Sequence, residues 1–200
     1  MNIIKYFMIG ISAWLVLSCN GQNKKEATTM KTTKALVVFF SHTGENYAVG
    51  NIQVGNTKIV ADRISELTGA AQFEIKTSKY DGMAYQPLVK LATQEKRNNE
   101  KPAFDGKVEN IGQYDVIFIG GPIWWGTYPQ VMFTFFDRYD LNGKTIIPFS
   151  THEGSGLADV VEDLRRLYPK ANITGANGFY GHEVRRSTGK VDAWIKKMGY

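Results

Sequence analysis

Ser41, Thr43 and Thr57 are hydroxyl residues placed where an apolar run gives way to a helical pattern. The run at 34–40 ends at Ser41-His42-Thr43-Gly44, and the helical pattern begins at Asn56-Thr57. The first N–H groups of a helix have no internal partner, and the helix dipole places partial positive charge there. We therefore expect a phosphate group to bind at this corner. No catalytic base or metal-ligand set appears in it.

Two adjacent tryptophans follow another apolar run. Residues 114–120 form the strongest such run, and it continues into Gly121-Pro122-Ile123-Trp124-Trp125-Gly126. Adjacent indoles point in different directions, so we expect one to stack on a flat ring and the other to pack inward. We expect the glycines to let the backbone approach a ligand closely, and Pro122 to stiffen the turn. The alternative is ordinary core or surface packing of both indoles.

A third polar segment, Thr151-His152-Glu153-Gly154-Ser155-Gly156, follows the apolar run at 144–149. Its N–H and hydroxyl groups suit the edge of a heteroaromatic ring. A phosphate, a polar tail and a flat ring together describe a mononucleotide, and flavin mononucleotide (FMN) best suits a tryptophan-lined slot. Two alternatives stay open for His152: contact with the ring edge, or hydrogen bonding to backbone. Tyr85 is expected in a loop, either covering the ring or packing on the sheet edge.

The elements around these segments predict how they come together. Apolar runs predict strands at 34–40, 71–75, 114–120 and 144–149 and a weaker one at 171–179. Helical periodicity predicts the helices between and after them, at 56–68, 87–98, 128–138, 157–168 and 189–198. This alternation predicts an α/β fold, a doubly wound five-stranded parallel sheet with helices on both faces. Ligands bind such sheets beyond the carboxyl ends of the strands, so the three segments form one composite site.

Residues 45–55 interrupt the alternation. Gly50-Asn51 lies between two short β-prone runs and predicts a hairpin with a two-residue turn. Asn56 is then expected to cap the helix that follows.

The chain resembles the flavodoxin family over about residues 34–200. That family's phosphate loop runs Ser/Thr-x-Thr-Gly-x-Thr, usually with Asn before the last Thr. Here Ser41-His42-Thr43-Gly44 is separated from Asn56-Thr57 by an eleven-residue insertion. A second alignment continues through Asn46-Tyr47 and lacks the final threonine. We prefer the split alignment, because Gly50 and Gly55 would interrupt a helix begun at Tyr47.

Two further segments, at 121–129 and 148–156, resemble the flavin loops of a bacterial flavodoxin-like subgroup. The resemblance implies the flavodoxin-like strand order 2-1-3-4-5 and FMN as the cofactor. Carried onto this sequence, the implied cofactor-binding residues are Ser41, His42, Thr43, Gly44, Asn56, Thr57, Pro122, Ile123, Trp124, Trp125, Gly126, Thr151, His152, Gly154, Ser155 and Gly156.

The first 33 residues have a different character. Lys5 precedes the apolar segment at 6–16, which is too short to span a membrane as a helix, so residues 1–19 are predicted to be a signal peptide. Its ending, Leu15-Val16-Leu17-Ser18-Cys19, resembles a bacterial lipobox, which implies lipidation of Cys19. The alternative is a free thiol. Residues 20–33 are polar and predicted to be a flexible tether. The domain at 34–200 is then exported and lipid-anchored on the periplasmic or cell-surface side of a bacterial membrane.

The remaining composition narrows the function. The formal net charge is +5, but basic residues are scattered in pairs such as Arg185-Arg186, which argues against nucleic-acid binding. No dinucleotide glycine fingerprint follows the first strand. The preferred function is one-electron transfer to a redox partner protein or small-molecule acceptor. The alternatives are an NAD(P)H-dependent FMN quinone or nitro-compound reductase, and an interaction module with or without flavin.

Overall fold

The computed structural model describes residues 34–200. The predicted signal peptide, the tether and Cys19 lie outside the described residues. Within the described part, no helix has both the length and the apolar character needed to cross a membrane.

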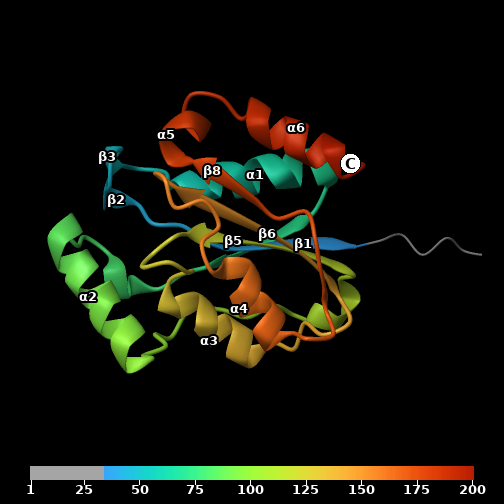
Figure 1. Cartoon of the computed structure of the whole chain (residues 1–200), viewed down its shortest axis with the longest axis horizontal. Helices are drawn as coiled ribbons and strands as arrows, with labels where there is room; N and C mark the ends of the chain where they lie inside the picture. Colours follow the sequence, from blue (N-terminus) through green and yellow to red (C-terminus); the bar gives the residue numbers. More distant parts are fainter. Residues whose placement is uncertain (1–33) are drawn as a thin grey trace, which may run out of the picture. The chain divides into compact units, whose positions relative to one another are not determined.

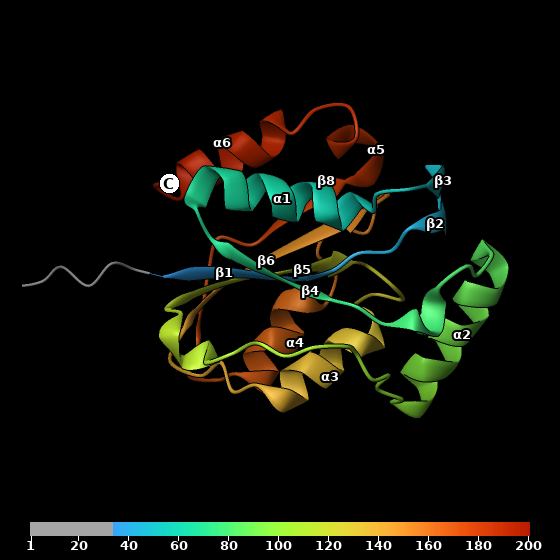
Figure 2. The same ribbon diagram turned by 180° about the vertical axis from the view of Figure 1, so that it is seen from behind.

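A parallel sheet forms the middle layer (Figures 1 and 2). Its main strands run in the order β4-β1-β5-β6 and then pair with two short strands. This confirms the α/β fold and the predicted order, because β4 is the second long strand of the chain and β5 and β6 are the third and fourth. Their bounds are β1 (Ala35–Phe40), β4 (Ala71–Ile75), β5 (Val116–Pro122), β6 (Thr145–His152), β7 (Asn172–Ile173) and β8 (Asn177–Tyr180).

The predicted fifth strand at 171–179 is wrong in one respect, because it is split in two. β7 pairs with the start of β6 and β8 pairs with its end. Gly175, between them, has a φ of 64°, which interrupts the extended backbone. An ideal Cβ on Gly175 would lie only 2.7 Å from Sδ of Met198, so the break also makes room for the C-terminal segment.

Helices cover both faces of the sheet. α1, α5 and α6 lie on one face, and α3 and α4 lie on the other (Figures 1 and 2). The predicted helices are confirmed to within a few residues, but the short α5 was not predicted. Their bounds are α1 (Asn56–Thr68), α2 (Tyr85–Asn98), α3 (Gln130–Arg138), α4 (Val160–Leu167), α5 (Gly181–Val184) and α6 (Gly189–Lys197), with 3₁₀ turns η1 (Ser78–Tyr80) and η2 (Ile111–Gln113).

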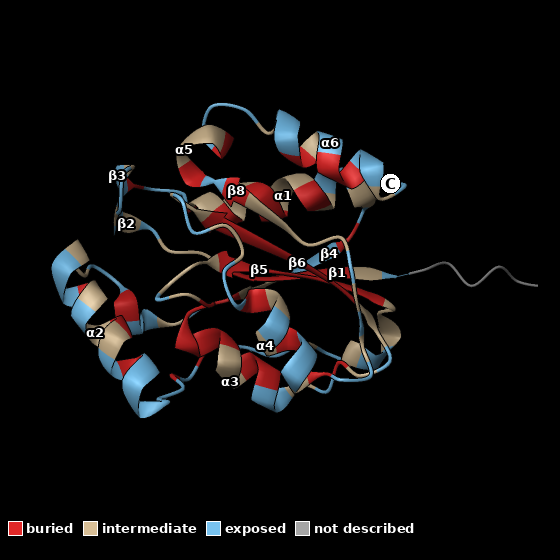
Figure 3. Ribbon diagram, viewed as in Figure 1, coloured by how far each residue is buried: buried red, intermediate tan, exposed pale blue. Residues whose placement is uncertain are grey.

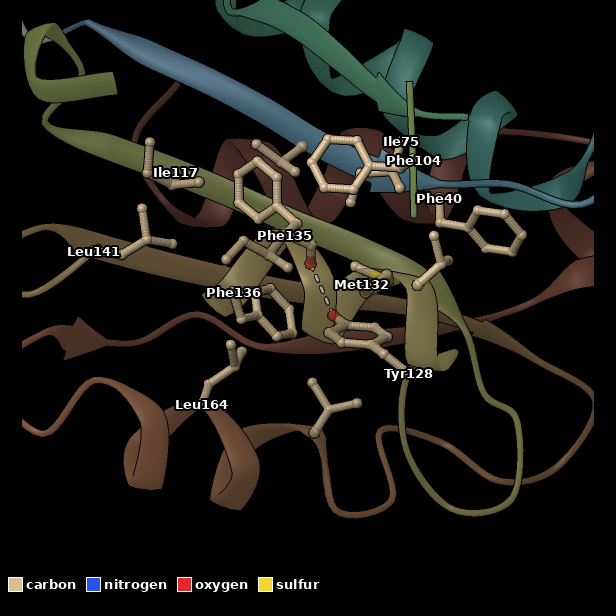
Figure 4. Close-up of a cluster of buried hydrophobic side chains, with 14 of the residues drawn as sticks. Phe40, Ile75, Phe104, Ile117, Tyr128, Met132, Phe135, Phe136, Leu141 and Leu164 are labelled. Atoms are coloured by element: carbon tan, nitrogen blue, oxygen red, sulfur yellow. Dashed lines mark hydrogen bonds between the residues drawn. The ribbon is translucent and has the colours of Figure 1, made fainter. Parts of the chain in front are cut away.

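The sheet separates two hydrophobic clusters, and the central strands are buried while the outer helix surfaces are exposed (Figure 3). In the cluster under α3 and α4, the Tyr128 ring packs among aromatic and aliphatic side chains (Figure 4). Its hydroxyl donates to the carbonyl oxygens of Ile119 and Phe149, each at 2.8 Å. This satisfies the one polar group of a buried ring and joins the segment before α3 to β5 and β6.

The glycines at the end of β5 serve the core and do not face a ligand, which corrects the expectation from the sequence. An ideal Cβ on Gly120 would lie 2.0 Å from the Phe149 ring, and one on Gly121 would lie 2.6 Å from Sδ of Met132. The absence of side chains at these positions therefore lets the large core residues reach the sheet.

The segment at 45–55 does form a hairpin, but its turn lies earlier than predicted. β2 (Gly44–Asn46) pairs with β3 (Gly50–Ile52), and Asn46 lies opposite Gly50. The turn consists of residues 47–49, where Ala48 has a φ of 61°. Gly50 has a φ of 73° and is the residue after the turn, so its left-handed conformation ends the turn instead of forming its centre.

Candidate functional site

The start of α1 is built by the loop after β1. Gly55 is the N-cap of α1, which corrects the prediction that Asn56 caps it. Ser41 supplies the missing side-chain cap from outside, since its Oγ accepts a hydrogen bond from the Lys58 N–H at 3.0 Å. Gly55 permits this approach, because an ideal Cβ there would lie 2.2 Å from Ser41 Oγ. Among the described residues, no hydrogen bond occupies the N–H groups of Asn56 and Thr57.

A pocket of about 320 Å³ opens beside this helix end, beyond the carboxyl ends of β1, β5 and β6. Five segments line it: the loop and hairpin after β1, the start of α1, one face of α2, the end of β5 with the loop after it, and the end of β6 with the loop after it. The lining residues are His42, Glu45, Asn46, Tyr47, Asn56, Thr57, Tyr85, Leu88, Val89, Ala92, Pro122, Ile123, Trp124, Trp125, Thr151, His152, Glu153 and Ser155.

Ten of the sixteen residues predicted to bind a cofactor line this pocket. Of the others, Gly154 donates its N–H to Nδ1 of His152 at 3.0 Å, and the carbonyl of Gly156 accepts from the Ser150 hydroxyl at 2.7 Å. These bonds shape the loop after β6. The six predicted residues that do not line the pocket are Ser41, Thr43, Gly44, Gly126, Gly154 and Gly156.

The two tryptophans occupy a tight turn. Trp124 and Thr127 exchange backbone hydrogen bonds, from Trp124 N–H at 2.8 Å and from Thr127 N–H at 3.4 Å. Trp125 and Gly126, between them, have φ values of 54° and 85°, as a type I′ turn requires. A left-handed tryptophan is strained, and strain of this kind gathers at functional sites. The turn presents the Trp125 indole, 53% exposed, beside the pocket.

The Trp124 indole packs inward. Its ring lies edge-on to Phe40 at 5.6 Å and to Tyr80 at 5.3 Å between centroids. His42 also meets it edge-on, at 5.9 Å. The two indoles therefore have different environments, one among aromatic side chains and one largely in solvent.

His42 brings an unsatisfied polar atom to the pocket. Its Nε2 is buried and has no hydrogen-bond partner. Burial lowers the pKa of the His42 imidazole, and the Asp81 carboxylate partly opposes this shift. The pocket is thus lined by a histidine whose neutral form is favoured and whose Nε2 has no hydrogen-bond partner.

A second wall of the pocket comes from α2 and the hairpin, and sequence reasoning missed it. Tyr85 is the first residue of α2, so the expectation of a loop tyrosine on the sheet edge is wrong. The Tyr85 ring stacks on that of Tyr47, with centroids 6.1 Å apart and planes at 29°. The backbone N–H of Tyr85 donates to the Glu45 carboxylate at 2.7 Å. The next turns of α2 add apolar side chains. Their helical spacing was visible in the sequence, but nothing there indicated which way this face points.

The third wall joins α1 to the end of β6. The hydroxyls of Thr57 and Thr151 hydrogen-bond at 2.8 Å, and both residues are buried. Burial also lowers the pKa of His152, against smaller raising effects of Glu153 and Glu183. With the Gly154 N–H donating to Nδ1, neutral His152 carries its proton on Nε2.

Glu153 is engaged by a residue far along the chain. Its Oε1 accepts from the backbone N–H of His182 at 2.9 Å, and its Oε2 lies 2.5 Å from Nδ1 of the same residue. α5 is therefore fastened to the pocket loop. Only the fold brings these residues together, because they are 29 positions apart.

Comparison with known proteins agrees with this architecture. The sequence model of the flavodoxin family matches residues 34–198, and the chain belongs to that family. A provisionally assigned flavoprotein from Bacteroides uniformis is 28% identical, with a TM-score of 0.62 over 82% of this chain and 98% of that one. A provisionally assigned flavoprotein from Bacteroides eggerthii is also 28% identical, with a TM-score of 0.57 over 80% and 99%.

A more distant structure shares the fold. It is a flavoprotein in complex with FMN from Lactobacillus acidophilus, 20% identical, with a TM-score of 0.58 over 82% of this chain and 99% of that chain. No curated protein matches the chain.

Proposed function

We propose that this protein binds FMN in the pocket and uses it to transfer electrons. The observation that carries the proposal is that the N-terminus of α1, where two N–H groups have no hydrogen-bond partner among the described residues, and the half-exposed Trp125 lie at one pocket. The pocket's volume falls at the lower end of the range of about 300–1,000 Å³ for small-molecule sites. The FMN-bound Lactobacillus acidophilus protein of the same fold supports the choice of ligand.

The donors around the pocket suit the parts of FMN. The N–H groups of Asn56 and Thr57 would hold the phosphate, where the α1 dipole favours negative charge. The Trp125 indole would stack on the ring system, and a polar atom of the ring would give the buried His42 Nε2 the hydrogen-bond partner that it lacks. Bound FMN supplies the redox chemistry, while the protein orients it and tunes its potential.

Electron transfer with a separate partner is the role we favour. Trp125 is 53% exposed at the pocket mouth, so an electron partner could approach a ring stacked there without a conformational change. The partner would be a redox protein or a small-molecule acceptor. A second role, an NAD(P)H-dependent quinone or nitro-compound reductase, is favoured by the apolar α2 face and the Tyr47–Tyr85 pair, which could receive a flat second substrate.

Flavin titration tests the shared part of both roles. We expect the purified protein to take up FMN with 1:1 stoichiometry and to change the flavin's visible absorption bands on binding. A protein that leaves those bands unchanged at any FMN concentration contradicts the proposal. Steady oxidation of NAD(P)H on addition of a quinone would favour the reductase, while its absence in a flavin-loaded protein would favour the carrier.

We also propose that the protein is exported and held at a bacterial membrane through lipid on Cys19. The support is the sequence pattern at 1–19, with small Ser18 before the cysteine. Covalent lipid would hold at a membrane a chain whose apolar segment is too short to span it. Cys19→Ser should move the protein from the membrane fraction to the soluble fraction in the native host. An unchanged membrane fraction would count against lipid attachment at this residue.

A further inference from the structure

Arg185 lies against the start of α1, although it belongs to the segment after α5. Its Nη1 donates to the carbonyl oxygen of Val54 at 2.7 Å and to Oδ1 of Asn56 at 3.2 Å. These two residues flank Gly55, the N-cap of α1. The guanidinium is therefore fixed at the positive end of the helix, next to a residue that lines the pocket.

The positive charge at this helix end has no acidic counterpart. The first turn of α1 holds no acidic residue, and its one charged side chain, Lys58, pairs with Asp62 a turn later. Among the residues that the structure describes, no carboxylate lies within ion-pair distance of Arg185. The carboxylate of Glu153, which lines the pocket, is already bonded twice by His182.

This arrangement is unfavourable unless an anion joins it. Acidic side chains stabilise the N-terminus of a helix, and a cation there is repelled by the dipole. Here the dipole, two N–H groups without a hydrogen-bond partner in the described range, and a guanidinium meet at the start of α1, where Asn56 and Thr57 line the pocket. An arginine fork is suited to phosphate, and among the described residues the other nitrogens of Arg185 make no hydrogen bond.

We propose that Arg185 is a specificity-determining residue that recognises a phosphate monoester dianion at the start of α1. In terms of the function proposed above, on which this inference rests, Arg185 selects FMN over riboflavin. The two ligands share the same ring and side chain and differ only in the phosphate. Arg185 therefore contributes to the affinity for FMN and contributes nothing to the affinity for riboflavin.

The chain offers a matched control, because Arg186 is also exposed and makes no side-chain hydrogen bond within the described range. Dissociation constants for FMN and riboflavin are measured by flavin fluorescence with full-length wild type, Arg185→Gln and Arg186→Gln. A hydrogen bond to a charged group is worth enough that Arg185→Gln should weaken FMN binding on the order of tenfold or more. Riboflavin binding should stay unchanged, and Arg186→Gln should leave both ligands unaffected.

Inorganic phosphate gives a second measurement, because it can occupy the phosphate site without contacting the residues that bind the flavin ring. It should compete with FMN for wild type and for Arg186→Gln, and compete more weakly for Arg185→Gln. An equal loss of FMN and riboflavin affinity in Arg185→Gln would show that Arg185 only braces the loop at Val54, and the inference fails. Unchanged FMN affinity also overturns it. A wild type that binds neither flavin refutes the proposed function itself, whereas equal wild-type affinity for both flavins refutes phosphate recognition alone.

Discussion

At the scale of single residues, the two tryptophans do different work despite being adjacent. The inward Trp124 packs edge-on against Phe40 and Tyr80, so it connects the pocket lining to the hydrophobic core. Trp125 has few such contacts, is more than half exposed, and has a left-handed backbone that few tryptophans adopt. A residue that contributes little to folding and sits in a strained conformation is one whose value is expected to be in binding.

Trp125→Ala should therefore weaken flavin binding more than it weakens folding. Losing an aromatic stacking partner costs about 0.5–1.5 kcal/mol beyond buried area, so FMN affinity should fall several-fold or more. The free energy of unfolding should change by about 0.5 kcal/mol or less, as for other exposed positions. Fluorescence titration and urea unfolding measure the two quantities. Equal FMN affinity in the variant would rule out stacking on this indole.

Trp194 provides the opposite case. It is 8% exposed in the other hydrophobic cluster, and its indole N–H donates to the carbonyl of Gly175 at 2.7 Å. Trp194→Phe should lower the free energy of unfolding, since the core loses volume and the Gly175 carbonyl loses its partner. Its effect on FMN affinity in the folded protein should be small. The pair of variants thus separates a binding role from a packing role.

The buried hydroxyl pair of Thr57 and Thr151 should behave as a unit. Either single change to valine leaves the other hydroxyl buried without its partner, which costs about 1–3 kcal/mol of unfolding free energy. The double variant should lose less than the sum of the single ones, because no orphaned hydroxyl remains. Urea unfolding of the four proteins measures the coupling. Strictly additive losses would show that the hydrogen bond does not operate in solution.

At the scale of elements, α2 is unusual because it packs beyond the end of the sheet, beside the β2–β3 hairpin (Figure 2). One of its attachments to the rest of the domain is polar and buried. Glu95, fully buried, accepts from the Tyr80 hydroxyl at 2.9 Å and pairs with Lys79 Nζ at 2.8 Å. Burial, and then the Glu95 carboxylate, raise the pKa of Tyr80, which keeps its hydroxyl protonated as the donor.

Replacing Glu95 should loosen this wall of the pocket. Glu95→Ala leaves a buried tyrosine hydroxyl unpaired, at a cost of about 1–3 kcal/mol in unfolding free energy. FMN affinity should fall with it, because Leu88 and Ala92 lie on the same helix and line the pocket. Glu95→Gln is the control, since it retains an acceptor for Tyr80 and should lose less of both. Full FMN affinity in a destabilised Glu95→Ala protein would show that α2 does not need this attachment to form the wall.

For α2, the sequence predicted the helix itself but not its orientation in the fold. The strands and helices followed from apolar runs and helical spacing, because burial on one or both faces imposes those patterns directly. The loops after β1, β5 and β6 followed from the rule that parallel strands end together at one edge. The orientation of α2, the Tyr47 contact with Tyr85 and the Glu153 contact with His182 depend on tertiary placement, which leaves no periodic trace. The glycines at 120–121 were misread for the same reason.

At the scale of the whole molecule, the sheet divides two hydrophobic clusters and gathers its three functional loops at one edge. Two histidines lie there in partly buried positions. Burial lowers the pKa of His42 and of His152, each against weaker carboxylate effects. An unfolded histidine, with a pKa of about 6.5, therefore binds protons more readily than either folded one.

Because both pKa values are lower in the folded protein, the free energy of unfolding decreases as the pH falls. At about pH 7.5 both histidines are mostly neutral in either state, so they do not affect the balance. As the pH falls through about 6.5, the unfolded chain takes up protons that the folded chain resists, and the free energy of unfolding decreases. Urea unfolding at steps between about pH 7.5 and pH 5.5 should show this loss for the wild type.

His42→Gln should make the pH dependence shallower. Glutamine has no proton to gain, so the contribution of His42 disappears, while His152 and the His182–Glu153 contact remain in both proteins and cancel in the comparison. The two curves should converge as the pH falls, because the wild type loses the stability that depends on a neutral His42. Bound FMN that donates a hydrogen bond to the lone pair of neutral Nε2 would oppose protonation of the ring, and should steepen the wild-type curve but not the variant's. Parallel curves with and without flavin would show that His42 is buried for packing alone and does not contact the ligand.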